Sequence, residues 1–290
     1  MTDFKIRLCT LENNCFDDIS SISKNTLEKV QEDITNITLY NSHFLVYIHF
    51  QINLIEFDSL RKKISKIPIV KLNMNKISTT RDHLKYNSIT INLLSSFRFY
   101  LDNAEKHIIR AFGKDSPELV NFKSELSSYF DNYFSYRFLY KLRDYALHVG
   151  FPIEMIHFEA KENITKPETM VGNLRLLVSK ESLLAEKKYL GKPVTNDLIK
   201  IVDDIDIIPL VTQLGALLLK LEKHIYSLHH EKLECAISNL KQFAGKYKTI
   251  KNDIVIIVDM KEEGNYINFN MITLPFVEIN DIERFSKWPK

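Results

Sequence analysis

Apolar residues recur at helical spacing over long stretches of this chain of 290 residues. Between residues 88 and 113 they fall at steps of three and four, with polar side chains on the opposite side. This is the pattern of an amphipathic helix, and its apolar positions are Leu94, Phe97, Leu101, Ala104, Ile108 and Phe112. Gly113 follows directly and suits the left-handed conformation that often ends a helix. We therefore predict a helix over residues 88–113.

A second periodic series predicts a longer helix from about Pro117 to about Val149. Most of its apolar residues are four positions apart, namely Phe122, Leu126, Phe130, Phe134, Phe138, Leu142 and Ala146. Ser116 is suited to cap the start of this helix, and Pro117 is suited to its first position. Because the connection at residues 114–119 is short, we expect the two helices to pack as a long antiparallel hairpin.

The residues before this hairpin have a weaker pattern. Residues 43–64 are apolar and only partly periodic, and their length favours a buried helix over a strand. Residues 67–77 are expected to form a short extended segment. We group residues 1–87 as an N-terminal helical extension of the hairpin.

The pattern changes several times after the hairpin. Residues 159–172 are polar and irregular, and residues 173–187 fit either a strand or a short helix. Residues 195–205 have helical periodicity. The long segment 208–246 has it too, and we expect this helix to break near His229.

Two β-rich runs near the C-terminus flank the turn-forming residues 262–265. Runs of this kind on either side of a turn predict a small β-hairpin, here at about 253–275. The fold class is therefore expected to be mainly α. A helical core at 88–155 would lie between the extension at 1–87 and a mostly helical region at 156–290.

The composition is that of a globular protein, since 45% of the residues are hydrophobic and 26% are charged. A formal net charge of +2 argues against a broad basic surface that coats nucleic acid, so any such contact should be local. The three cysteines have no CxxC spacing, which argues against a disulfide framework or a structural zinc site. No apolar run is long enough to span a bilayer, so we expect a cytoplasmic protein without a membrane partner.

Few motifs for catalysis remain after the common ones are excluded. The chain has no GxSxG, GxxxxGK[ST], GxGxxG or HExxH motif, so we expect no metal ion and no cofactor. The segment YKLRDYALHVGFP, residues 140–152, does carry Arg143 and His148. A histidine exchanges protons near neutral pH, and an arginine binds phosphate oxygens with a planar, permanently charged group. Together these two residue types can cleave RNA without a metal ion.

The spacing of Arg143 and His148 sets a condition on any such site. Five residues along a straight helix correspond to a rotation of about 140°, so the two side chains do not share a face. Two chains related by a two-fold axis would instead bring two arginines and two histidines to one cleft. The alternative is that His148 is a helix-end histidine, which the helix dipole favours without any catalytic role.

Residues 88–155 resemble the HEPN superfamily, the all-helical domains of prokaryotic toxins and defence nucleases. The resemblance rests on the long helix NLLSSFRFYLDNAEKHIIRAFG (92–113), a connection, and a second long helix ending in Arg143-x4-His148. The family motif is an arginine and a histidine separated by about four to six residues, with a polar residue commonly directly after the arginine. Asp144 takes that place here, where asparagine is frequent among relatives.

The resemblance implies a metal-independent endoribonuclease of toxin or phage-defence type, which works as a homodimer with the two motifs meeting at the interface. It also implies an alternative, since many HEPN domains are catalytically silent and serve as binding or scaffold modules for RNA, a nucleotide or a protein. The partners expected under these hypotheses are RNA, a second copy of the chain and an antitoxin-like protein.

Four residues are predicted to form the centre of the site. Arg143 would bind the phosphate and His148 would transfer the proton. Asp144 would orient one of them, and Tyr140 would support the site. Asp144 adds negative charge beside the phosphate, which favours the binding module, whereas the intact Arg143–His148 motif favours the nuclease.

Further charged residues are expected around this centre. Arg137 and Lys141 precede the motif on the same helix and are predicted to bind flanking RNA phosphates. Asp102 or Glu105 on the facing helix is expected to pair with Arg143. Such a pair would hold the guanidinium in one orientation.

Overall fold

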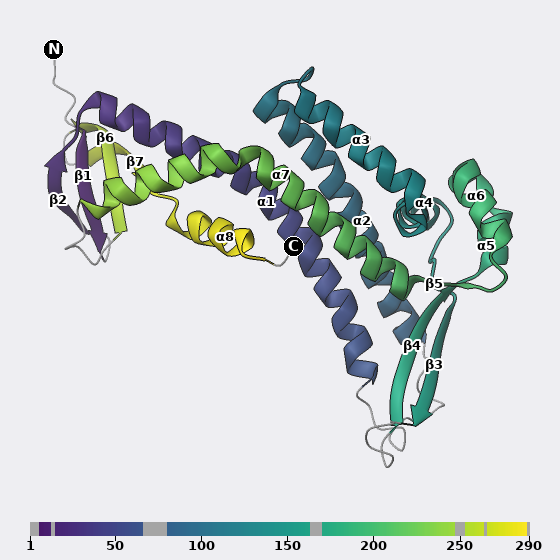
Figure 1. Cartoon of the computed structure of the whole chain (residues 1–290). Coiled ribbons are helices and arrows are strands. Elements are labelled where there is room, and N and C mark those ends of the chain that lie inside the picture. The colour runs from purple at the N-terminus through teal and green to yellow at the C-terminus, as the bar shows by residue number, and fades with distance from the viewer. Residues whose placement is uncertain are drawn as a thin grey trace. The chain divides into compact units, whose positions relative to one another are not determined.

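A computed structural model describes residues 6–12, 15–65, 80–162, 170–246, 253–263 and 266–288 of the chain. The protein is mainly helical, with small antiparallel sheets (Figure 1). It divides into two compact units: unit 1 consists of Met1–Phe44 and His224–Lys290, and unit 2 of Leu45–Lys223. Two long helices, α1 (Lys24–Ser65) and α7 (Ile207–Gly245), contribute residues to both units. This division differs from the three consecutive regions predicted, because both ends of the chain belong to one unit.

Unit 1 contains a four-stranded antiparallel sheet with the strand order β2-β1-β6-β7. Its strands are β1 (Arg7–Glu12), β2 (Cys15–Ser21), β6 (Asp253–Glu263) and β7 (Tyr266–Thr273). Cys9, Val255 and Ile257 form a buried cluster on this sheet. Strands β6 and β7 pair in the range for which a hairpin was predicted, and residues 264 and 265 between them lie outside the described residues.

The prediction of a helical N-terminal extension is wrong for Arg7–Glu12 and Cys15–Ser21, which form β1 and β2. Leu8, Cys9 and Thr10 are all buried, so β1 lacks the alternation of apolar and polar residues that marks a one-sided strand. Its pairing with β6 also joins residues far apart in the sequence, as between Arg7 and Ile257. Such long-range pairing leaves no pattern in the local sequence.

Helix α8 (Phe276–Ser286) adds an aromatic cluster to unit 1, and the sequence patterns did not predict this helix. The ring of Phe285 lies 5.0 Å from that of Phe44 and 5.8 Å from that of Tyr226, measured between centroids. His229 of α7 is buried, and its ring centroid is 5.5 Å from that of Tyr40. Aromatic side chains from three helices therefore form a core in this unit.

Unit 2 contains the first predicted helix as α2 (Thr80–Phe112), which begins earlier than expected. Its apolar face is buried, with Phe97 and Ala104 fully inaccessible to solvent. Gly113 has a φ of 102°, in the left-handed region that favours glycine at the end of a helix. The prediction of this helix and of its C-terminal glycine is confirmed.

The single long helix predicted next is wrong, although its start is as expected. Ser116 caps α3 (Pro117–Asn132), because its hydroxyl accepts a hydrogen bond from the Leu119 N–H over 3.2 Å. At Tyr133 the backbone becomes extended, with φ of −119° and ψ of 111°, and a new helix α4 (Phe134–His148) begins. The break contains no proline or glycine, so the local sequence gave no indication of it.

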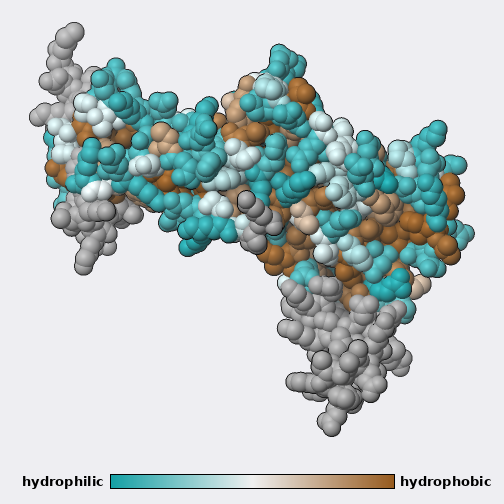
Figure 2. All heavy atoms as spheres, viewed as in Figure 1, coloured by the Kyte–Doolittle hydropathy of each residue, from teal (hydrophilic) through white to brown (hydrophobic). Residues whose placement is uncertain are grey.

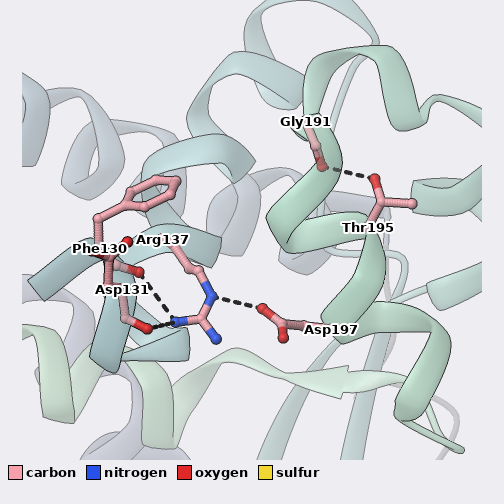
Figure 3. Close-up of polar contacts among 6 residues, drawn as sticks. All are labelled: Phe130, Asp131, Arg137, Gly191, Thr195 and Asp197. Carbon is pink, nitrogen blue, oxygen red and sulfur yellow. Dashed lines mark hydrogen bonds and ion pairs between the residues drawn. The ribbon is translucent and has the colours of Figure 1, made fainter. Parts of the chain in front are cut away.

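A side chain from α4 stabilises this break. The last carbonyl groups of a helix have no hydrogen-bond donors within that helix. At the end of α3 the Arg137 guanidinium is the donor, since its Nη1 donates to Phe130 O and to Asp131 O at 3.1 Å each. The Nε of Arg137 donates to Asp197 Oδ2 at 2.6 Å, on helix α6 (Gly191–Lys200) (Figure 3). One arginine thus joins α3, α4 and α6.

The remainder of unit 2 includes a three-stranded antiparallel sheet with the order β3-β4-β5. The further elements are β3 (Met155–Glu162), β4 (Met170–Val178), β5 (Ile205–Asp206), α5 (Lys180–Ala185) and the 3₁₀ helix η3 (Lys187–Tyr189). Residues 173–187 contain both a strand and a helix, with Ser179 as the cap of α5. The irregular stretch predicted at 159–172 is wrong in part, because β3 and β4 occupy its ends. The helix predicted at 195–205 begins earlier and ends before β5.

The long helices follow their predicted patterns with one exception. Helix α1 contains the helix predicted at 43–64, while residues 67–77 lie outside the described residues. Helix α7 runs without the break expected near His229, because its buried face continues through Ile225 and Leu233. Within the described residues, no helix has the length and apolar character needed to cross a membrane. Figure 2 shows a mainly hydrophilic face, with hydrophobic surface gathered around α5 and α6.

Candidate functional site

All six predicted site residues lie on α4, which divides them between different faces. Arg137, Lys141, Asp144 and His148 are spaced by four, three and four residues, so they form one stripe along the helix. This α6-facing stripe meets α6 and η3 through Arg137, Lys141 and His148. Because α4 is helical through His148, Arg143 lies about 140° from that histidine around the helix axis.

His148 is the last residue of α4 and is exposed to solvent. Its imidazole stacks on the ring of Tyr189 from η3, with centroids 5.1 Å apart and planes inclined by 10°. The ammonium of Lys188 lies 4.9 Å from the centroid of the same tyrosine ring. Glu186 is 3.4 Å from Lys188, and this hydrogen-bonded carboxylate raises the pKa of the lysine. The histidine is therefore held from a second element of unit 2.

Asp144 lies between two cations. Its Oδ1 is 3.6 Å from Arg143 Nη1, and its Oδ2 is 3.4 Å from Lys141 Nζ. The Nε of Arg143 is buried and makes no hydrogen bond to the part of the chain that the structure describes. The group of three charges thus carries one net positive charge. Because Nε is buried, an external anion would bind the exposed part of the guanidinium.

Tyr140 lies on the side of α4 that packs against α2. Its ring is 6.3 Å from Phe97 and 6.4 Å from Tyr136, between centroids, and the Arg98 guanidinium carbon lies 4.6 Å from the Tyr140 centroid. Arg98 in turn pairs with Asp102 at 3.1 Å. Tyr140 therefore fixes α4 on α2, which supports the motif through packing and not through contact with His148.

The expected acidic partners of Arg143 on α2 pair with other residues. Asp102 binds Arg98, and Glu105 lies 2.9 Å from Lys123 of α3. The register of two packed helices depends on the details of their contact, which helical spacing alone does not give. The carboxylate nearest to Arg143 is instead its neighbour in the sequence, Asp144.

Arg137 has a structural role in place of the predicted contact with an RNA phosphate. Its side chain is only 15% exposed, and its donors bind Asp197 and two carbonyl groups. Releasing these acceptors would leave a partly buried carboxylate without its cation. We therefore exclude Arg137 from the RNA-binding residues.

The fold brings two residues to the motif that the sequence patterns do not indicate. Tyr189 and Lys188 belong to η3; Tyr189 stacks on His148, and the Lys188 ammonium lies over the Tyr189 ring. They follow the motif by about forty positions, in the run AEKKYLG, which has no recognisable motif. Only the topology around α6 brings this run beside the end of α4.

The described residues show no candidate metal centre, since no three histidine, cysteine, aspartate or glutamate side chains among them come together. An open hollow of about 580 Å³ beside α5 includes Lys180, Glu181 and Asp204 in its lining. Another, of about 770 Å³, lies between α1 and α7 in unit 1. Neither hollow is lined by a residue of the predicted site.

No protein-family model, curated protein or solved structure that was compared with the chain matches it. The resemblance to the HEPN superfamily therefore rests on residues 88–155 alone. The chemistry at the end of α4 stands independently of that resemblance. It combines an exposed imidazole with two cations that share one carboxylate, an arrangement suited to an anionic ligand.

Proposed function

We propose that the protein is a metal-independent endoribonuclease of toxin or phage-defence type, with a composite site formed by Arg143 and His148 of two copies. The observation that carries this proposal is the environment of Arg143, whose only close carboxylate among the described residues is Asp144 at 3.6 Å. Ion pairs on partly exposed surfaces contribute about 0–1 kcal/mol. An RNA phosphate can therefore replace Asp144 as the partner of the guanidinium.

The reaction would be an internal transesterification. His148 of one copy accepts the proton of a ribose 2′-hydroxyl while the 2′ oxygen forms a bond to the adjacent phosphorus. The bond between phosphorus and the 5′ oxygen breaks, and His148 of the second copy donates a proton to that oxygen. Arg143 stabilises the negative charge that develops on the phosphorane oxygens. The products are a 2′,3′-cyclic phosphate and a free 5′-hydroxyl.

Exposed apolar residues beside the motif support a second copy as part of the site. Leu147, Val149, Phe151 and Met155 are each at least 41% exposed, and two of them flank His148 in the sequence. Apolar residues exposed singly are common, but a group within so few positions is typical of an interaction surface. Burying this apolar group against a second chain would stabilise a dimer by about 25 cal/mol for each Å² of apolar surface.

A catalytically silent binding or scaffold protein is the second candidate. It is favoured by Asp144, whose negative charge lies beside the cations that would bind the phosphate. In that case Lys141 and Arg143 bind an anionic partner without cleaving it, and the exposed apolar group forms a structural interface.

The two candidates are separated by incubating the purified protein with total RNA in EDTA. We expect cleavage by the wild type, with 2′,3′-cyclic phosphate ends on the products. The His148→Ala variant should cleave about 10²–10⁴-fold more slowly, because it lacks the residue that transfers the proton. His230→Ala is a matched control, since His230 is an exposed helix histidine in unit 1 with a carboxylate 4.0 Å away. A folded wild-type dimer that leaves RNA intact would replace the nuclease with the scaffold.

A further inference from the structure

We infer that Tyr189 is a positioning residue for His148, a role that rests on the proposed function. Tyr189 comes from η3, and its ring stacks on the imidazole at 5.1 Å with an inclination of only 10°. Two other contacts between a histidine and an aromatic ring have a different geometry. His49 meets Phe99 edge to face at 88°, and His230 meets Tyr226 at 57°. The near-parallel stack restricts the orientation of the His148 ring plane, whereas an edge contact leaves that orientation free.

The tyrosine is itself held in place. Its backbone N–H donates to the carbonyl of Glu186 at 3.1 Å, and the following residue, Leu190, is fully buried. Lys188 lies over the Tyr189 ring, and Glu186 binds Lys188. The ring that supports His148 therefore has little freedom of its own.

The other end of α4 fixes the distance between the two rings. Arg137 binds Asp197 of α6 at 2.6 Å, and both side chains are largely buried. Helix α6 begins at Gly191, whose carbonyl accepts a hydrogen bond from the Thr195 hydroxyl at 2.9 Å (Figure 3). Since η3 ends immediately before α6, the ion pair holds Tyr189 at a set position along α4. Two points on one helix, separated by about three turns, thus bind one rigid neighbour.

This support matters because His148 is exposed at a helix end. An exposed side chain exchanges among its rotamers, whereas a general base must lie within hydrogen-bond distance of the proton that it accepts. A misplacement of about 1 Å in a catalytic group can reduce a rate by about 10²-fold. Tyr189 would limit this reduction of the rate, because it keeps the imidazole in one orientation before RNA binds.

The test compares Tyr189→Phe, which retains the stacked ring, with Tyr189→Leu, which removes it. The resonances of His148 are identified in ¹H–¹³C spectra of the free protein by their absence in His148→Asn. Stacking should shift them upfield, with the same shift in Tyr189→Phe and loss of the shift in Tyr189→Leu. Phe99→Leu is the matched control, because it removes an exposed aromatic ring from a histidine that is not stacked.

Activity is measured on the same proteins. We expect Tyr189→Leu to lower kcat about tenfold with little change in KM, since RNA phosphates are bound elsewhere, and Tyr189→Phe to restore kcat. Unchanged His148 resonances in Tyr189→Leu, or an unchanged kcat when the wild type cleaves RNA, would overturn the positioning role. If the wild type does not cleave RNA, the proposed function fails, and the spectra still decide whether Tyr189 holds His148.

Discussion

Arg137 and Arg143 lie on the same helix, but their surroundings differ in ways that matter for binding an anion. Arg137 is 15% exposed, and its donors reach Asp197 at 2.6 Å and two carbonyl groups at 3.1 Å. Arg143 is 34% exposed, and its contact with Asp144 is 3.6 Å long. Its Nε is buried without an acceptor among the described residues, so an external anion would bind the exposed part of this guanidinium.

A guanidinium whose donors are satisfied within the chain stabilises the fold, whereas one with open donors can bind an external acceptor. Both arginines were predicted to bind RNA phosphates, Arg143 as part of the Arg-x4-His motif and Arg137 because it precedes that motif on the same helix. The two arginines differ because Arg137 has Asp197 as its partner, and Asp197 lies 60 positions from Arg137 in the sequence. The difference between the two arginines is therefore a property of the tertiary structure, and variants of each can test it.

The largest expected effect is on catalysis, from Arg143→Ala. Removing the group that stabilises charge in the transition state should slow RNA cleavage by about 10²–10³-fold. The free energy of unfolding should change by less than about 0.5 kcal/mol, because the lost contact is long and partly exposed. Initial cleavage rates and urea unfolding of the same preparations provide the two measurements.

Arg143→Lys is the control for charge. A lysine keeps the positive charge and loses the planar fork, so cleavage should fall less than in Arg143→Ala. Arg143→Ala could instead lower the free energy of unfolding by as much as it raises the activation free energy of cleavage. Arg143 would then be a structural residue like Arg137, and the distinction between a binding and a structural arginine would be lost.

The second effect is on stability, from Arg137→Ala. This change leaves the Asp197 carboxylate without its cation and two helix-end carbonyls without a donor. Breaking a fully buried ion pair costs about 3–5 kcal/mol, and the partial exposure here reduces the expected loss to about 2–3 kcal/mol. Urea unfolding measures it, and the His148 resonances should shift as well, because α6 and η3 lose their attachment to α4.

A double-mutant cycle isolates the ion pair from the other contacts of Arg137. If the pair accounts for the loss, Arg137→Ala and Asp197→Asn together should cost clearly less than the sum of the two single changes. A variant Arg137→Ala with normal stability and reduced RNA binding would instead restore the role predicted from the sequence.

Local chemistry explains which parts of the fold could be predicted. The end of α2 at Gly113 and the Ser116 cap of α3 depend on residues close in sequence, and both are confirmed. The break at Tyr133 depends on the Arg137 side chain, whose anchor Asp197 is distant in sequence. The strand β1 was missed for the same reason, since its partner β6 comes from the other end of the chain.

The candidate site divides in the same way. Spacing alone gave the offset between Arg143 and His148 on α4, because the offset follows from helix geometry. It gave no indication of Tyr189, which reaches His148 through the connection between α5 and α6. Nor did it give the partners of Asp102 and Glu105, which depend on how α2 packs against its neighbours.

The histidines also differ in burial, because His229 is buried and His148 is exposed. His229 is buried in unit 1, and desolvation, together with the nearby charges of His43 and Lys232, lowers its pKa to about 4. An unfolded histidine has a pKa near about 6.5, so the folded state favours the neutral ring. This contribution to stability is complete above about pH 6.5 and is lost as the pH falls to about 4, with about 2 kcal/mol lost at pH 5.

Urea unfolding of the full chain at pH 7 and pH 5 tests this prediction, with His229→Gln as the comparison. The variant lacks the titrating ring, so its stability should fall less between the two pH values than that of the wild type. The carboxylates titrate equally in both proteins and cancel in the difference. Equal pH dependence of stability in the wild type and His229→Gln would contradict the prediction.

The smallest expected effect is on dimerisation, and it tests whether the site at the C-terminal end of α4 needs a second copy of the chain. Phe151→Asp adds a charge to the exposed apolar group, and it should weaken dimerisation about tenfold, or about 1.4 kcal/mol, as measured by sedimentation. Cleavage should fall at low protein concentration and recover at high concentration, because the variant keeps Arg143 and His148. Val202→Asp is the control, as another exposed apolar residue, located after α6. Loss of cleavage that does not recover with concentration would mean that Phe151 acts on the motif within one chain, and the composite site would then lose its support.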